Sequence, residues 1–174
     1  RSIDSCFNQT YKKIEIVVFD DKSTDGSINE LKKIDNIKLI INTNKKKNIP
    51  ALDALNAYKT SFKNSTGQII FLLDSDDYFE IDKVEKVVNF FTTNTDKIFL
   101  QNLTYLVTSS EKIEIRNKNS YLSKWPYFAP ESCISFKREF FNELINEGNL
   151  FDNEYETVWL GFRLACNAFF LKKN

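Results

Sequence analysis

The chain has 174 residues, the length of one domain, and its 24 basic and 24 acidic residues balance to a formal net charge of zero. That balance argues against a nucleic-acid-binding protein, whose phosphate contacts need a surplus of lysine and arginine. The sequence contains no histidine, which excludes a Ser-His-Asp triad, an imidazole base and histidine-ligated zinc and leaves acid–base chemistry to carboxylates, lysine, tyrosine or cysteine.

The first half of the chain alternates strand-length apolar runs with segments of helical periodicity. Apolar, mostly β-branched and aromatic runs predict strands at residues 14–19, 37–41 and 69–73. Apolar residues at helical spacing predict three helices, which carry Ile28, Leu31 and Ile34; Leu52, Leu55 and Phe62 after Pro50; and Val84, Val87, Val88 and Phe91 after Asp82 as N-cap. The alternation predicts an α/β fold with a largely parallel sheet, whose ligands bind outside the carboxyl ends of the strands.

Beyond residue 97 the pattern changes to an α+β arrangement. It predicts two strands of a hairpin, one further strand and two helices, at residues 98–107, 113–116, 133–136, 138–146 and 153–169. No linker or repeat interrupts the chain, so we expect one domain over residues 1–174 with halves at 1–96 and 97–174.

The cysteine pattern and the hydropathy pattern both bear on the cellular compartment of the protein. Cys6, Cys133 and Cys166 lie far apart and form no CxxC pair, which favours reduced thiols in a cytoplasmic protein. No apolar run approaches the roughly 18 residues that cross a bilayer. We therefore expect a cytoplasmic protein.

The strongest chemical signal is Asp74-Ser75-Asp76-Asp77, directly after the third predicted strand. Two carboxylates that flank one residue can present oxygens to a hard cation, and Mg²⁺ typically takes only one or two protein carboxylates. The alternative interpretation is an Asp-rich turn that leads into the next helix.

A second acidic pair, Asp20-Asp21, ends the first predicted strand. A carboxylate there can accept a hydrogen bond from a nucleotide base or ribose, whereas two adjacent buried carboxylates repel one another unless something uses them. The following residues 23–26 (Ser-Thr-Asp-Gly) supply a turn and a helix N-cap, and turn formation alone is the alternative interpretation.

Two blocks of the chain together resemble the family 2 glycosyltransferases of the GT-A fold. They are SCFNQTYKKIEIVVFDDKSTDGS at residues 5–27 and GQIIFLLDSDD at residues 67–77, the second of which is similar to that family's DxD segment. The resemblance implies a Rossmann-like mixed sheet flanked by helices, with a nucleotide-binding half at residues 1–96 and an acceptor-side half at 97–174. Family members open with a strand before the helix that contains Cys6, and that strand is absent here, so we expect a fragment of a longer protein.

The resemblance also implies a metal-dependent, inverting transfer of a sugar from a nucleotide donor, often UDP-linked, to an acceptor hydroxyl. By position, Asp21 with Asp20 beside it would contact the base, and Asp74 would face the ribose. Asp76, with Asp74, would ligate Mg²⁺ or Mn²⁺ on the diphosphate, and Asp77 would assist near the acceptor. The metal stabilises a diphosphate leaving group as a Lewis acid, so no histidine is needed.

The catalytic base is where the sequence departs from the family. An acidic pair, Glu-Asp, is common there with an arginine seven residues after the glutamate, and Glu156-Thr157 precedes Arg163 in that register. Thr157 therefore stands where the family has its catalytic aspartate. We expect Glu156 to act as base, with Asp152 and Glu154 nearby; a solvated helix start is the alternative.

Two further candidates complete the site. Lys46, within the run of residues 45–47, would bring positive charge to the donor diphosphate in place of the family's arginine, and Trp125 would stack on a sugar. A solvated lysine loop and an aromatic core lid are the respective alternatives. Family analogy implies bacterial surface glycan synthesis, with a glycan or lipid-linked acceptor and peripheral association with the inner face of the membrane.

Two other functions remain open. Thr157 motivates a catalytically silent nucleotide-sugar binding domain, and the paired acids after strands also occur in receiver domains. The long second half, rich in tryptophan and phenylalanine, does not suit a receiver domain.

Overall fold

The computed structural model describes residues 1–44, 47–108, 112–115, 130–146 and 157–170. Its strands are β1 (Ile16–Asp20), β2 (Ile37–Ile41), β3 (Ile69–Phe71), β4 (Phe99–Gln101), β5 (Thr104–Val107), β6 (Lys112–Ile115) and β7 (Ile134–Lys137). Its helices are α1 (Ser2–Phe7), α2 (Ser27–Leu31), α3 (Pro50–Lys63), α4 (Lys83–Thr93), α5 (Arg138–Asn146) and α6 (Leu160–Phe170), with the 3₁₀ turn η1 (Glu131–Cys133) before β7.

The strands pair in three groups. β1 and β2 are parallel, with Ile16 opposite Ile37 and Asp20 opposite Ile41. β7 lies between β3 and β4 and is antiparallel to both. Because β3 and β4 run in the same direction, their carboxyl ends meet at the edge where η1 enters β7. β5 and β6 form the expected hairpin.

The prediction of a largely parallel sheet is wrong for the described strands, because only β1 and β2 pair in parallel. The strand from the second half, β7, enters between β3 and β4 and reverses the local direction. Its Ile134 and Phe136 are almost completely buried, so apolar burial drives this insertion. The mixed sheet that the family resemblance implied agrees with this arrangement.

Several element boundaries also differ from expectation. α2 ends at Leu31, before Ile34, and α6 begins only at Leu160. The single strand predicted for residues 98–107 is divided into β4 and β5. Between them the Asn102 N–H donates to the Cys133 carbonyl, at 3.0 Å, and the Asn102 side-chain amide donates to the Leu103 carbonyl. α5 has the predicted bounds.

Asp82 precedes α4 as predicted, but its side chain makes no capping hydrogen bond. Its carboxylate pairs instead with Lys86, at 2.7 Å. The backbone N–H of Val84 in the first turn of α4 donates to the side-chain oxygen of Gln9, at 2.9 Å. The cap of this helix therefore comes from a distant segment.

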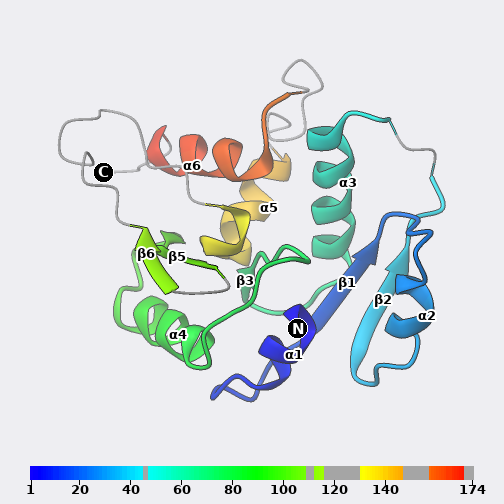
Figure 1. Cartoon of the computed structure of the whole chain (residues 1–174). Helices are drawn as coiled ribbons and strands as arrows, with labels where there is room; N and C mark the ends of the chain where they lie inside the picture. The colour runs from blue at the N-terminus through cyan, green and yellow to red at the C-terminus, as the bar shows by residue number, and fades with distance from the viewer. Residues whose placement is uncertain (45–46, 109–111, 116–129, 147–156, 171–174) are drawn as a thin grey trace.

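The main core joins α3, β7, α5 and α6. The rings of Phe136 and Phe141 stack with their centroids 5.3 Å apart. The ring centroid of Phe62, from α3, lies 4.2 Å from that of Phe141. Burying a side chain of this size contributes roughly 1.5–3 kcal/mol. α3 also contacts both β1 and α6 (Figure 1), which fixes its position beside the carboxyl ends of the strands.

Cys133 is buried and Cys6 and Cys166 are half-buried, and all three are free thiols. Burial raises the pKa of Cys133 and of Cys6, so both are neutral near pH 7. In the part of the chain that the structure describes, no helix combines the length and the apolarity that a bilayer crossing requires.

Candidate functional site

The two acidic segments lie at the carboxyl ends of β1 and β3, as the sequence predicted, but Asp20 and Asp21 differ in their surroundings. Asp20 is 5% exposed, and its Oδ1 accepts a hydrogen bond from the Ser23 backbone N–H at 3.0 Å. This bond closes the turn after β1, as the turn interpretation expected. Asp20 therefore stabilises the loop that carries Asp21.

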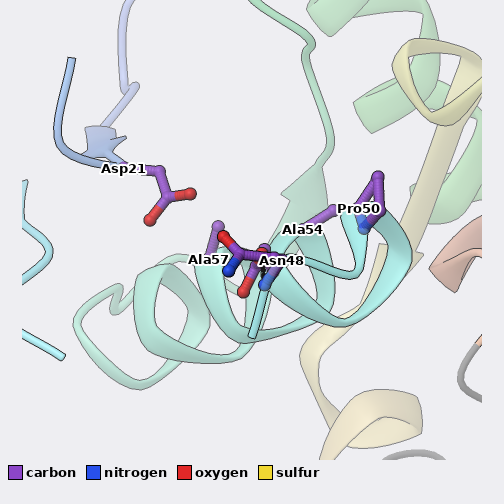
Figure 2. Close-up of a pocket in the computed structure, with 6 residues that line it drawn as sticks. Asp21, Asn48, Pro50, Ala54 and Ala57 are labelled. Carbon is purple, nitrogen blue, oxygen red and sulfur yellow. Dashed lines mark hydrogen bonds between the residues drawn. The ribbon is translucent and has the colours of Figure 1, made fainter. Parts of the chain in front are cut away.

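Asp21 lines a pocket of about 560 Å³ between the end of β1 and α3 (Figure 2). The other lining residues are Asn48, Pro50, Asp53, Ala54 and Ala57. Figure 2 shows the Asp21 carboxylate facing Asn48 and Ala57 across this space. The pocket thus combines hydrogen-bond acceptors with small side chains that leave room for a flat ring.

Neighbouring loops hold the polar residues of this pocket in place. The Asn42 side-chain amide, after β2, donates to Asp21 Oδ1 at 2.5 Å, and Asn42 is itself buried. On the opposite wall the Asp53 carboxylate accepts hydrogen bonds from the backbone N–H groups of Lys47, at 2.9 Å, and Asn48, at 3.0 Å. Asn48 adopts a left-handed conformation, with φ of 59°, which asparagine tolerates better than most residues.

Asp74 begins the second acidic segment and is held on several sides. Its backbone N–H donates to Ser132 Oγ in η1 at 2.9 Å, and its backbone carbonyl accepts from Ser2 Oγ in α1 at 3.3 Å. Its carboxylate Oδ1 accepts a hydrogen bond from the Tyr58 hydroxyl in α3 at 2.6 Å. Within the described part of the chain, Oδ2 accepts no hydrogen bond.

Opposing effects act on the ionisation of this pair. Burial raises the pKa of Asp74, the hydrogen bond from Tyr58 lowers it, and the carboxylates of Glu131, Asp77 and Asp76 raise it again, with a net shift upward. Burial and the adjacent Asp74 carboxylate raise the pKa of Tyr58 well above its ordinary value. The Tyr58 phenol therefore stays protonated and acts as a donor at every physiological pH.

The remaining carboxylates of this segment are accessible. Asp76 is exposed and Asp77 half-buried, and neither side chain makes a hydrogen bond to another described residue. Among the described residues no three acidic, cysteine or histidine side chains converge tightly enough to enclose a metal ion. Oδ2 of Asp74 and the Asp76 carboxylate are hard oxygen donors, which fits Mg²⁺ or Mn²⁺ because such ions keep several ligands from water and phosphate.

Sequence reasoning missed the supports of the acidic segment. The Lys83 ammonium donates to the Ser132 carbonyl and lies 4.1 Å from the centroid of the Phe79 ring. Burial lowers the pKa of Lys83 to about 8. Lys83 therefore fastens η1, and through Ser132 the Asp74 backbone, to the start of α4.

The helix before β1 gives a second support. Ser5 Oγ accepts a hydrogen bond from the Phe79 N–H at 3.0 Å, and the fully buried Gln9 amide donates to the Glu80 carbonyl at 2.8 Å. Ser5 and Gln9 lie inside the first block of family resemblance, which marked them without indicating their roles. Ser5 in α1 and Gln9 just after α1 therefore both hold the backbone that follows Asp74.

Several predicted site residues lie outside the described residues, namely Lys46, Trp125, Asp152, Glu154 and Glu156. Thr157 is described and exposed, just before α6. Arg163 is buried, and its Nε donates to the Val158 carbonyl at 2.9 Å. This arginine therefore holds the chain at the entrance to α6.

One helix joins the two acidic segments. Ala54 and Ala57 of α3 line the pocket at Asp21, and the next residue, Tyr58, reaches Asp74. A rigid helix thus sets the spacing between a pocket that suits a flat ring and carboxylates that suit a cation.

Comparisons with known proteins find similar glycosyltransferases. The chain is 33% identical over 106 residues to UDP-Glc:alpha-D-GlcNAc-diphosphoundecaprenol beta-1,3-glucosyltransferase WfaP from Escherichia coli, a match that covers 61% of this chain and 40% of WfaP. It is 29% identical over 130 residues to the enzyme WfgD of the same description and organism, covering 75% of this chain and 45% of WfgD. An uncharacterised glycosyltransferase from Haemophilus influenzae is 34% identical over 127 residues, a match that covers 66% of this chain and 48% of that protein. The chain therefore spans less than half the length of these relatives.

Among solved structures, residues 1–349 of TarS from S. aureus match with a TM-score of 0.63 and 16% identity, over 95% of this chain and 50% of that one. The likeness establishes the GT-A fold that the resemblance implied. The model of the family described as "Glycosyl transferase family 2" matches residues 1–145, which is most of the chain. The chain belongs to glycosyl transferase family 2.

Proposed function

We propose that the chain forms the donor-binding part of an inverting glycosyltransferase, which moves a sugar from a nucleoside diphosphate, most simply UDP, to an acceptor hydroxyl. One observation carries this proposal: two consecutive residues of α3 contact the two acidic segments. Ala57 lines the pocket beside Asp21, and Tyr58 donates a hydrogen bond to the Asp74 carboxylate. Family membership supports the transfer of a glycosyl group.

The pocket at Asp21 would hold the base. The Asp21 carboxylate accepts hydrogen bonds, and uracil offers one N–H donor between two carbonyl groups. The small Ala54 and Ala57 on the opposite wall leave space for a planar ring. The descriptions of WfaP and WfgD name UDP-glucose as their donor, which favours uridine over other nucleosides for this chain.

The segment from Asp74 to Asp77 would hold the ribose and the diphosphate end. Asp74 and Asp76 would ligate Mg²⁺ or Mn²⁺, which stabilises negative charge on the departing diphosphate. Asp77 would lie toward the acceptor, and Lys46 would add positive charge for the diphosphate. Asp20 supports the loop that carries Asp21, because its carboxylate accepts a hydrogen bond from the Ser23 backbone N–H.

An inverting displacement needs one base to take the proton of the acceptor hydroxyl. We assign this role to Glu156, because Thr157 cannot ionise near neutral pH. Trp125 would stack on a sugar ring. WfaP and WfgD are described as acting on an undecaprenol diphosphate-linked sugar, so we propose a lipid-linked acceptor in bacterial surface glycan synthesis, reached from the cytoplasmic side of the membrane.

Thr157 favours a second candidate, a nucleotide-sugar binding domain without transfer activity. A comparison of Glu156→Gln with the unmodified chain separates the two candidates. If Glu156 is the base, the variant binds donor normally but loses transfer and donor hydrolysis by at least about a hundredfold. Donor binding without turnover by the unmodified chain would favour the binding domain.

The decisive experiment measures thermal stability with UDP, GDP or ADP, each with and without Mn²⁺. A ligand that binds only the native state raises its stability by about 2.7 kcal/mol at a hundred times Kd. We expect UDP with Mn²⁺ to raise Tm most, and Asp76→Asn to reduce the metal-dependent part. Asp96→Asn, at an exposed carboxylate paired with Lys97, is the matched control. The proposal fails if no nucleotide gives a metal-dependent shift.

A further inference from the structure

Tyr58 reaches Asp74 from a different element. The Tyr58 hydroxyl lies 2.6 Å from Asp74 Oδ1, and the ring is partly buried against the apolar core of α3, β7, α5 and α6. Packing therefore fixes the ring, and the hydroxyl has a defined direction. Helical spacing with Leu55 and Phe62 marks Tyr58 only as a core residue, and nothing in the sequence indicates its contact with Asp74.

Resting on the proposed function, we propose that Tyr58 is a positioning residue, which orients the Asp74 carboxylate so that Oδ2 faces the donor nucleotide. The backbone of Asp74 is already fixed on both sides, by Ser132 at its N–H and by Ser2 at its carbonyl. The remaining freedom is rotation of the carboxylate, and the bond to Oδ1 removes it. Hydrogen bonds to an ionised acceptor are about twice as strong as neutral ones.

The chemical type of the partner matters as much as its position. A lysine or arginine in this place would orient Asp74 but would also neutralise it and repel a cation. A phenol orients the carboxylate and leaves its full negative charge for a ligand. Glu131, Asp76 and Asp77 lie close enough to influence Asp74 electrostatically, so the segment keeps a strongly negative potential.

The same residue relates the two ends of the site. Ala57 lines the pocket at Asp21, and Tyr58 follows it in a regular helix. A shift of α3 along its axis would move the pocket wall and the Tyr58 hydroxyl together, and so would change the orientation of the Asp74 carboxylate. Tyr58 therefore couples the register of the base pocket to the orientation of the carboxylate.

The test is the affinity for UDP with Mn²⁺, measured by titration calorimetry on the complete chain. Tyr58→Phe removes one oxygen and keeps the ring, and we expect Kd to rise about tenfold. Where transfer is measured, donor KM should rise by a similar factor while kcat changes less than about threefold, because Tyr58 acts on binding geometry. Phe62→Leu, in the same helix and core, controls for lost packing and should leave Kd within about twofold.

A double-mutant cycle with Asp74→Ala shows whether Tyr58 acts through Asp74. Once Asp74 is removed, Tyr58→Phe should weaken UDP–Mn²⁺ binding by no more than about twofold. An unchanged Kd for Tyr58→Phe, or an equal loss in both backgrounds, overturns this inference while leaving the proposed function intact. Absence of nucleotide binding by the unmodified chain overturns the proposed function and this inference with it.

Discussion

The side-chain oxygen of Gln9 accepts the backbone N–H of Val84 at 2.9 Å, across 75 residues of sequence. The Gln9 amide also donates to the carbonyls of Ser5, at 2.9 Å, and Glu80, at 2.8 Å, and the residue has no exposed surface. One side chain thus ends α1, caps α4 and fixes the loop that follows the acidic segment.

We expect Gln9→Ala to lower the free energy of unfolding by roughly 2–4 kcal/mol, because it leaves buried backbone groups without partners. Urea denaturation measures this change. Asn29→Ala, at an exposed position of α2, is the control and should change stability by less than about 0.5 kcal/mol. Equal effects of the two substitutions would show that Gln9 does not fasten α4.

The glycine at the start of α6 gives a second expectation about stability. A Cβ at Gly161 would lie 3.0 Å from Ile134 Cδ1, in the core, and 3.1 Å from Glu131 Oε1. The Glu131 carboxylate also accepts the Gly161 N–H at 3.1 Å. Overpacking costs about 1–3 kcal/mol, and the helix propensity gained from alanine returns up to about 1 kcal/mol.

We therefore expect Gly161→Ala to destabilise the protein by about 1 kcal/mol, seen as a lower urea midpoint. A Cβ at Gly67 would meet only Ile69 O, at 3.6 Å, an ordinary contact. Gly67→Ala should accordingly be neutral or raise stability by about 0.5 kcal/mol, because alanine lowers the conformational entropy of the unfolded chain. A tolerated Gly161→Ala would mean that η1 and α6 can separate without loss.

The sequence predicted elements whose signals are local. The apolar spacing of residues 138–146 defined α5, and the acidic residues after β1 and β3 located both ends of the candidate site. It did not predict β7 between β3 and β4, because strand order depends on pairing between segments that are distant in the sequence. The break between β4 and β5 likewise depends on a hydrogen bond from Asn102 to Cys133, a contact between distant segments.

The supports of the site were missed for the same reason. Tyr58 is 16 residues from Asp74, and Ser132 is 58 residues from it. In isolation Tyr58 reads as one more aromatic residue on a helix, and Lys83 as an exposed lysine at a helix start. The motif identified the carboxylate, whereas the groups that aim it became visible only once α3 and η1 were placed against β3.

Lys83 gives an expectation about pH. Burial lowers its pKa from 10.5 to about 8, so between these values the unfolded chain binds a proton that the native chain does not. The free energy of unfolding contributed by Lys83 therefore rises with pH from about 8 to 10.5, by up to about 1.4 kcal/mol per pH unit. Urea denaturation at pH 7.5, 8.5 and 9.5 should show a more positive slope for the unmodified chain than for Lys83→Met. Parallel slopes would mean that Lys83 keeps its ordinary pKa.

The pocket beside Asp21 can be tested by filling it. Ala57→Leu adds three carbon atoms to a wall of the pocket, and we expect it to weaken UDP binding at least tenfold by steric exclusion. Lys63→Leu, an exposed position of the same helix, should leave UDP affinity unchanged.

A measurement of Mn²⁺ binding without nucleotide shows whether Ala57→Leu affects only the part of the site that holds the base. Because Asp74 and Asp76 lie outside the pocket, both substitutions should preserve whatever affinity for Mn²⁺ alone the unmodified chain shows, measured by titration calorimetry. Unaltered UDP affinity in Ala57→Leu would place the base elsewhere. Loss of UDP binding with intact Mn²⁺ binding would instead support a pocket and a carboxylate segment that act on different ends of one ligand, held at a fixed spacing by α3.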